Sequence, residues 1–151
     1  MADVSDSIAR EVARLSNEGE ALADEGDCRG ALGRFQSAWG LLPEPRLDCD
    51  AAWSVLSAIG DMQFQLGEYL EALDSFMAVM KAFEGATGNP FLRLRLGQAM
   101  FELGEEKEAA SWLAGAYLLG GVSIFEDDDP KYLAFIKPQL DPPPGGWPEG
   151  W

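Results

Sequence analysis

The stretch of sequence that decides the fold runs over residues 60–79 and reads GDMQFQLGEYLEALDSFMAV. Steps of seven, five, four and three residues connect its marked positions, which are Gly60, Gly67, Ala72, Phe76 and Val79. The same steps lead from Gly19 to Gly26, Ala31, Phe35 and Ala38, and from Gly97 to Gly104, Ala109, Leu113 and Ala116. Five positions that keep the same residue size in three copies indicate an internal repeat.

Each marked position suits a pair of antiparallel helices. The first glycine lets a neighbouring helix approach closely, and the second ends the first helix in a left-handed cap. An acidic residue follows at the start of the second helix, where it is favourable, and it is Asp27, Glu68 or Glu105. The alanine marks the helix crossing, and the large apolar residue four positions later fills the groove one turn on. The pattern therefore predicts three helical hairpins.

Apolar periodicity and helix-breaking residues extend the prediction to the whole chain. Helices are expected near residues 5–25, 28–41, 48–66, 69–84, 90–103, 106–119 and 130–139, with no strands. Asp129 before Pro130 predicts an N-cap for the last helix. That helix is expected to cover the end of the third hairpin with Tyr132, Leu133, Phe135 and Ile136. The sequence thus predicts one all-α domain over residues 1–140, followed by an extended Pro/Gly/Trp tail over 141–151.

These positions resemble the tetratricopeptide repeat, a helical hairpin of about 34 residues. Ile59-Gly60 and Leu96-Gly97 match the Leu-Gly of the family pattern, whereas Glu18 stands where an apolar residue is usual. Counting by that length places repeats at about 12–45, 53–86 and 90–123. The resemblance implies a right-handed array of three hairpins plus a C-terminal capping helix, with the first helices lining a concave groove.

Charge and composition exclude several classes of function. The chain has 26 acidic and 11 basic residues, a net charge of -15, and no histidine. This balance argues against nucleic-acid binding, and the lack of histidine excludes histidine-based triads and histidine zinc ligands. Cys28 and Cys49 form no CxxC motif and are interpreted as reduced packing residues. With no signal peptide and no apolar run of about 18 residues, the sequence predicts a cytoplasmic protein without membrane contact or cofactor. Its oligomeric state is left open.

The run Glu126 to Asp129 offers the one opening for an enzyme, because hard cations bind several carboxylate oxygens. It lacks the ligand spacing and central glycine of a calcium-binding EF-hand. We interpret it as a solvated loop whose last aspartate caps a helix, and we expect neither a metal site nor catalysis. A carboxylate-based, metal-dependent enzyme remains the alternative from a different class.

The resemblance also implies which residues face the groove. Residue by residue they are Ser16, Asn17, Glu20, Ala23, Asp24, Ser54, Ser57, Asp61, Phe64, Gln65, Phe91, Leu94, Gln98, Phe101 and Glu102. We predict partner binding by Glu20, Asp24, Asp61, Phe64, Gln65, Gln98, Phe101 and Glu102, together with Trp147 and Trp151 of the tail. Phe64 and Phe101 occupy equivalent slots and act either as binding anchors or as core. The two tryptophans either dock on the body or a partner, or belong to a disordered end.

A finer resemblance concerns residues 121–135, GVSIFEDDDPKYLAF, which precede the Pro- and Trp-containing end. This stretch resembles small bacterial tetratricopeptide proteins that are immunity proteins of polymorphic or contact-delivered toxins. It implies a non-enzymatic protein that binds a basic toxin domain, consistent with the acidic charge. Size and repeat number also resemble acidic secretion chaperones, which hold a translocator or effector segment in the groove. Arg95 is the one plausible groove cation, which disfavours binding of acidic chaperone tails.

Overall fold

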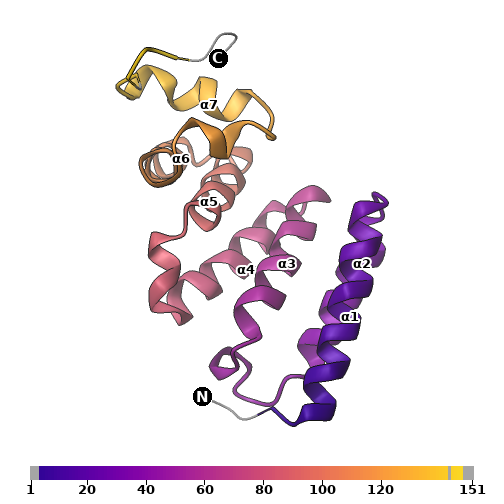
Figure 1. Cartoon of the computed structure of the whole chain (residues 1–151). Coiled ribbons are helices and arrows are strands. Elements are labelled where there is room, and N and C mark those ends of the chain that lie inside the picture. Colours follow the sequence, from indigo (N-terminus) through magenta and orange to yellow (C-terminus); the bar gives the residue numbers. More distant parts are fainter. Residues whose placement is uncertain (1–3, 143, 148–151) are drawn as a thin grey trace. The chain divides into compact units, whose positions relative to one another are not determined.

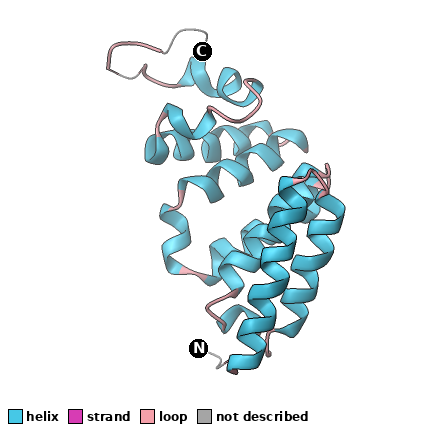
Figure 2. Ribbon diagram, turned by 45° about the vertical axis from the view of Figure 1, so that its right-hand side comes forward, coloured by secondary structure: helices cyan, strands magenta, loops and turns pink. Residues whose placement is uncertain are grey.

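The computed structural model describes residues 4–142 and 144–147, and all regular structure within them is helical (Figures 1 and 2). The α-helices are α1 Asp6–Asp24, α2 Cys28–Leu41, α3 Ala52–Gln65, α4 Tyr69–Ala82, α5 Pro90–Glu102, α6 Glu106–Gly120 and α7 Lys131–Ile136. Four 3-10 turns connect or extend them: η1 Arg46–Asp48, η2 Glu84–Gly88, η3 Val122–Phe125 and η4 Lys137–Gln139. The predicted all-α fold class is confirmed, since the helices pack in consecutive pairs.

The chain forms two compact units, Met1–Ala86 and Thr87–Trp151. The first contains the hairpins α1/α2 and α3/α4. The second contains the hairpin α5/α6 together with α7. None of the described helices is long and apolar enough to cross a membrane.

The turn inside each hairpin has the same construction. Gly26, Gly67 and Gly104 have φ angles of +85°, +78° and +85°, a region that L side chains rarely adopt. The next residue's N–H then bonds to the carbonyl five residues earlier, at 2.8 Å in Asp27 to Leu22, 2.8 Å in Glu68 to Gln63 and 2.9 Å in Glu105 to Met100. These bonds satisfy the carbonyls at the end of the first helix. The predicted left-handed caps are therefore confirmed.

The two helices of each hairpin meet where the first glycine faces the large apolar residue. A Cβ atom added to that glycine would lie 2.7 Å from the ring of Phe35 at Gly19, 3.0 Å from the ring of Phe76 at Gly60 and 2.6 Å from Leu113 at Gly97. Ala31, Ala72 and Ala109 are completely buried at the crossings. The predicted repeat register is thus confirmed in all three hairpins.

Helix α3 begins later than the predicted start at residue 48. Arg46–Asp48 instead form η1, which packs against α3 and α4. The Arg46 guanidinium donates a 3.0 Å hydrogen bond to the carbonyl of Trp39, and Cys49 is fully buried. The predicted helix start is wrong because these contacts hold the segment in a tighter turn before the helix begins.

The C-terminal helix is shorter than the predicted range of 130–139. It ends at Ile136 and continues as η4, since Pro138 has no N–H with which to extend the α-helix. The predicted cover of the third hairpin is confirmed, because Tyr132, Leu133 and Ile136 are buried. The tail is not extended throughout, because the chain turns at residues 144–145.

Candidate binding sites

The predicted groove residues of the first compact unit differ in exposure. Glu20 and Asp24 on α1 and Gln65 at the end of α3 are exposed, whereas Asp61 is half-buried. Glu20 and Asp24 form no ion pair with any residue that the structure describes. Both carboxylates are therefore exposed to solvent.

This unit also carries most of the negative charge. Residues 1–86 contain 16 acidic and 6 basic side chains, a net charge of -10 out of the total of -15. Four of the basic side chains lie in ion pairs within the unit: Arg14 with Glu11 and Glu18, Arg29 with Glu68, Arg34 with Glu18, and Arg46 with Glu44. The surplus carboxylates give the unit a negative field that would attract a basic partner.

A pocket of about 500 Å³ lies between α1 and α3 and is called the α1/α3 pocket below. It is lined mainly by Ala9, Val12, Ala13 and Ser16 of α1 and by Asp50, Ala51, Ser54 and Val55 in and before α3. Ala13 and Ser54 occupy equivalent positions, each six residues before the first glycine of its hairpin. The structure thus brings together Ser16 and Ser54 from the predicted groove, while the acidic groove residues lie outside this pocket.

The two predicted aromatic anchors have aromatic neighbours in their own compact units. The ring of Phe64 packs edge-to-face on Tyr69, with centroids 5.4 Å apart. The ring of Phe101 packs edge-to-face on Tyr132 and Phe135, at 5.5 and 4.9 Å. Both phenylalanines are half-buried, so each supports internal packing and keeps part of its surface exposed.

Glu102 is held inside the third hairpin and its cap. The hydroxyl of Tyr132 donates a 2.7 Å hydrogen bond to its carboxylate, and Lys131 forms an ion pair with the same oxygen. Burial alone raises the pKa of Glu102, but the hydrogen bonds from Lys131 and Tyr132 outweigh it and hold the pKa below its ordinary value. The carboxylate therefore anchors α7 to α5.

Gln98 has no exposed surface and lies in a polar network around Arg95, which is 8% exposed. The Arg95 guanidinium donates hydrogen bonds to the Gln98 Oε1 at 2.7 Å and to the Asp128 carboxylate at 3.0 Å, and it lies 5.0 Å from the Phe91 ring centroid. The Gln98 Nε2 has no hydrogen-bond partner among the described residues. The network ties α5 to the acidic loop, which was not foreseen from the sequence.

The acidic run at 126–129 acts structurally in two of its residues. Asp128 pairs with Arg95, and the Asp129 carboxylate accepts a 3.0 Å hydrogen bond from the Lys131 backbone N–H at the start of α7. Among the described residues no group of three or more His, Cys, Asp or Glu side chains could hold a metal ion.

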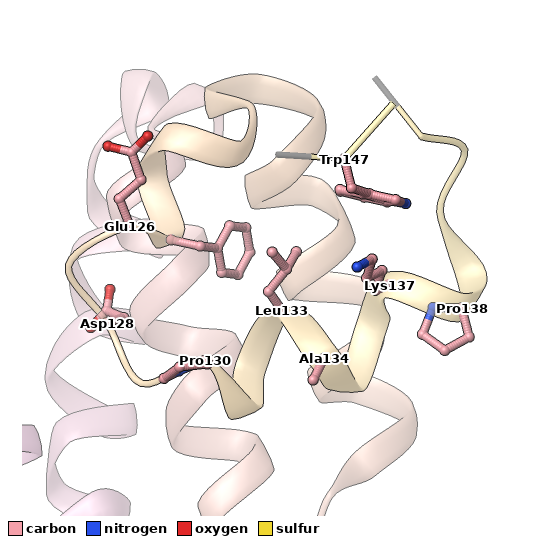
Figure 3. Close-up of a pocket in the computed structure, with 9 residues that line it drawn as sticks. Glu126, Asp128, Pro130, Leu133, Ala134, Lys137, Pro138 and Trp147 are labelled. Carbon is pink, nitrogen blue, oxygen red and sulfur yellow. The ribbon is translucent and has the colours of Figure 1, made fainter. Parts of the chain in front are cut away.

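A second pocket, of about 710 Å³, lies beside α7 and is called the α7 pocket below (Figure 3). Its lining includes Phe125, Leu133, Ala134 and Pro138, with Trp147 contributed by the tail. The Trp147 ring lies 5.8 Å from the ring of Tyr117 and 5.1 Å from the Lys137 Nζ. Trp147 thus docks on the body of the protein, while Trp151 lies outside the described residues.

Sequence reasoning identified Trp147 but missed the pocket that it helps to form. The available signal was the pair of prolines, Pro130 and Pro138, which bracket the short helix α7 and line the pocket. No known family model matches the sequence, and comparison with curated proteins found no match. The features of the described residues that bear on function are therefore the two pockets and the charge around them.

Proposed function

We propose that this chain is a non-enzymatic, tetratricopeptide-like protein that binds a basic protein partner, and that it serves as an immunity protein against a bacterial toxin domain. The observation that carries the proposal is the α1/α3 pocket. Equivalent positions on consecutive hairpins line it, and it lies on the compact unit with a net charge of -10. Such a surface suits recognition of an extended protein segment.

The α1/α3 pocket is suited to a partner's side chain in size and chemistry. Its volume of about 500 Å³ lies in the range of ligand pockets, and its walls are mostly short apolar residues. Asp50 supplies a carboxylate to the lining, and the exposed Glu20 and Asp24 lie on the same helix as one of its walls. A basic partner would be steered by the carboxylates and held by the apolar contact.

The resemblance of residues 121–135 to toxin immunity proteins supports the immunity role over the chaperone role. A toxin that acts on nucleic acid or another polyanion needs a basic surface, which an acidic inhibitor can cover. Co-expression with the product of the adjacent gene tests this directly. An immunity protein forms a stable complex with it and restores growth of cells that the partner alone inhibits. A complex with a partner that does not inhibit growth would favour the chaperone role instead.

The site within that complex is tested by filling the pocket. Replacing Ala13 by Trp should place a large ring in the α1/α3 pocket and weaken binding by about tenfold or more, mainly through faster dissociation. Ala21→Trp is the matched control, because Ala21 is exposed on the same helix and does not line the pocket. Equal affinities of both variants and the wild type would contradict this site.

The acidic surface is expected to act on a different rate. Glu20→Lys combined with Asp24→Lys should slow association and flatten its dependence on salt, with a smaller effect on dissociation. Surface plasmon resonance at low and high salt measures both rates. Unchanged association at low salt would show that these carboxylates do not steer the partner.

A further inference from the structure

We infer that the α7 pocket is a second docking site, and that it takes a segment of the basic partner in which one large apolar side chain lies next to a lysine or arginine. The inference rests on the proposed function, because the occupant belongs to the same partner. It adds a site on the second compact unit to the one on the first.

The apolar floor of the α7 pocket is already formed in the folded chain. Phe125 and Leu133 line it while being only 3% and 4% exposed, so their positions are set by the core behind them. The short side chains of Ala134 and Pro138 leave the space of about 710 Å³ open. A partner's apolar side chain can therefore enter without a rearrangement of the floor, which lowers the cost of binding.

The wall contributed by Trp147 has two supports. Its ring contacts Tyr117 of α6 and lies beside the Lys137 ammonium, so the indole is held from two sides. An aromatic wall beside an apolar floor is typical of the pockets that take anchor residues at protein interfaces. This chemistry selects a large apolar side chain over a polar one.

The two ends of the α7 pocket differ in charge, which selects the neighbour of that side chain. Figure 3 shows Glu126 and Asp128 at one end, and Lys137 with Trp147 at the other. Asp128 is already paired with Arg95, whereas Glu126 is exposed and forms no ion pair with the described residues. A cation next to the apolar side chain would therefore pair with Glu126, while the reverse orientation would bring it near Lys137.

A second copy of this chain suits the pocket less well than a basic segment. Each copy has a net charge of -15, so two copies repel each other at the encounter stage. The remaining candidate occupant is the chain's own end, residues 148–151, and the experiment below distinguishes it.

Short synthetic peptides test the site without knowledge of the partner. The probe has one phenylalanine flanked by lysines, and it is titrated to millimolar concentration into the ¹⁵N-labelled full chain, with the indole N–H of Trp147 as the NMR signal. We expect saturable binding of this probe. Two matched peptides, with Ala in place of Phe or with Glu in place of Lys, should each bind at least about tenfold more weakly.

Variants of the protein locate the binding. Ala134→Trp should weaken the affinity for the probe peptide by about tenfold. Gln139→Trp replaces an exposed residue that does not line the pocket, and it should change this affinity by less than about twofold. Glu126→Lys should weaken it by about threefold or more, compared with less than about twofold for Glu108→Lys on α6.

Three results would overturn the inference: no saturable binding, equal binding of the phenylalanine and alanine peptides, or a rise in affinity of about tenfold when residues 148–151 are deleted, which would identify the tail as the occupant.

Failure of the inference is separable from failure of the proposed function. If the protein partner still binds, and Ala13→Trp weakens it while Ala134→Trp does not, the inference fails and the function stands. If the adjacent gene product does not bind the wild type at all, the proposed function fails, and the peptide titration still decides whether the pocket takes this chemistry.

Discussion

At the scale of single residues, replacement by alanine should have opposite effects on stability at two helical glycines of the first hairpin, Gly19 and Gly33. A Cβ atom at Gly19 would lie 2.7 Å from the ring of Phe35, whereas a Cβ atom at Gly33 would meet nothing within 4 Å. Gly19→Ala should therefore force the helices apart and lower the free energy of unfolding by about 1–3 kcal/mol. Gly33→Ala should raise it by about 0.5–1 kcal/mol, because alanine favours the helix over glycine. Urea denaturation measures both, and the same sign for the two variants would contradict the close approach at Gly19.

Glu102 predicts a dependence of stability on pH. Its pKa is lowered in the folded state from an ordinary value of 4.5, so its contribution is present above that value and is lost as the pH falls through the folded pKa. Glu102→Gln keeps an acceptor for the Tyr132 hydroxyl and removes the charge that pairs with Lys131. We expect the variant to melt lower than the wild type at pH 7, by about 2–4 °C.

Measuring the wild type and Glu102→Gln at lower pH supplies the control for this prediction. As the pH falls through the lowered pKa that Glu102 has in the folded protein, the wild-type carboxyl becomes protonated and the two melting temperatures should converge. A difference that persists unchanged to the lowest pH at which both proteins stay folded would mean that the charge of Glu102 does not stabilise the contact with α7.

At the scale of helices, the starts of the three second helices differ although their positions in the repeat are equivalent. Asp27 accepts a 2.8 Å hydrogen bond from the Gly30 backbone N–H, whereas Glu68 and Glu105 make no such cap. A Cβ atom at residue 30 would lie 2.4 Å from the Asp27 carboxylate, so glycine there leaves room for the capping side chain. In the first hairpin, the N-terminus of the second helix is thus stabilised by a side-chain cap that the other two hairpins lack.

Removal of the cap should reveal this difference. Asp27→Ala should cost about 1 kcal/mol of stability, because the Gly30 N–H loses its partner. Asp27→Asn should keep most of it, because asparagine is an equally good cap, and Glu105→Ala should cost at most about 0.5 kcal/mol through the helix dipole alone. Chemical denaturation of the three variants checks the order, and an equal loss for Asp27→Ala and Glu105→Ala would contradict the role of the hydrogen bond.

At the scale of the whole molecule, charge repulsion opposes folding. The chain has 26 acidic and 11 basic side chains, and the ion pairs among the described residues are mostly on the surface, where each contributes little. Salt screens both the repulsion and these pairs, with a Debye length that falls from about 30 Å at 0.01 M to about 8 Å at 0.15 M. Because like charges dominate, the melting temperature should rise between these concentrations in sodium chloride. A fall would show that the ion pairs contribute more than the net charge costs.

The three hairpins could be predicted from the sequence alone because the contacts that form them are local. A left-handed glycine, a buried alanine and a large apolar residue act within about one hairpin of each other, so their spacing is sufficient to set the helix pair. Gly60, Ala72 and Phe76 lie where the repeat pattern requires. The start of α3 could not be predicted in this way. Arg46 to Cys49 form a turn that depends on contacts outside the repeat pattern, and the apolar periodicity does not predict such contacts.

Whether a predicted binding residue is free to contact a partner depends on contacts between residues far apart in the chain. Gln98 accepts a hydrogen bond from Arg95, which also bonds to Asp128, 33 residues further on. Glu102 accepts a hydrogen bond from Tyr132, 30 residues further on. Trp147 reaches Tyr117 and completes the α7 pocket in the same way. A sequence pattern states which residues share a helix face, and this decided the hairpins. The tertiary structure alone decides which polar side chains on that face pair with other residues of the protein. This is because such pairs depend on which distant segments of the chain pack against the face.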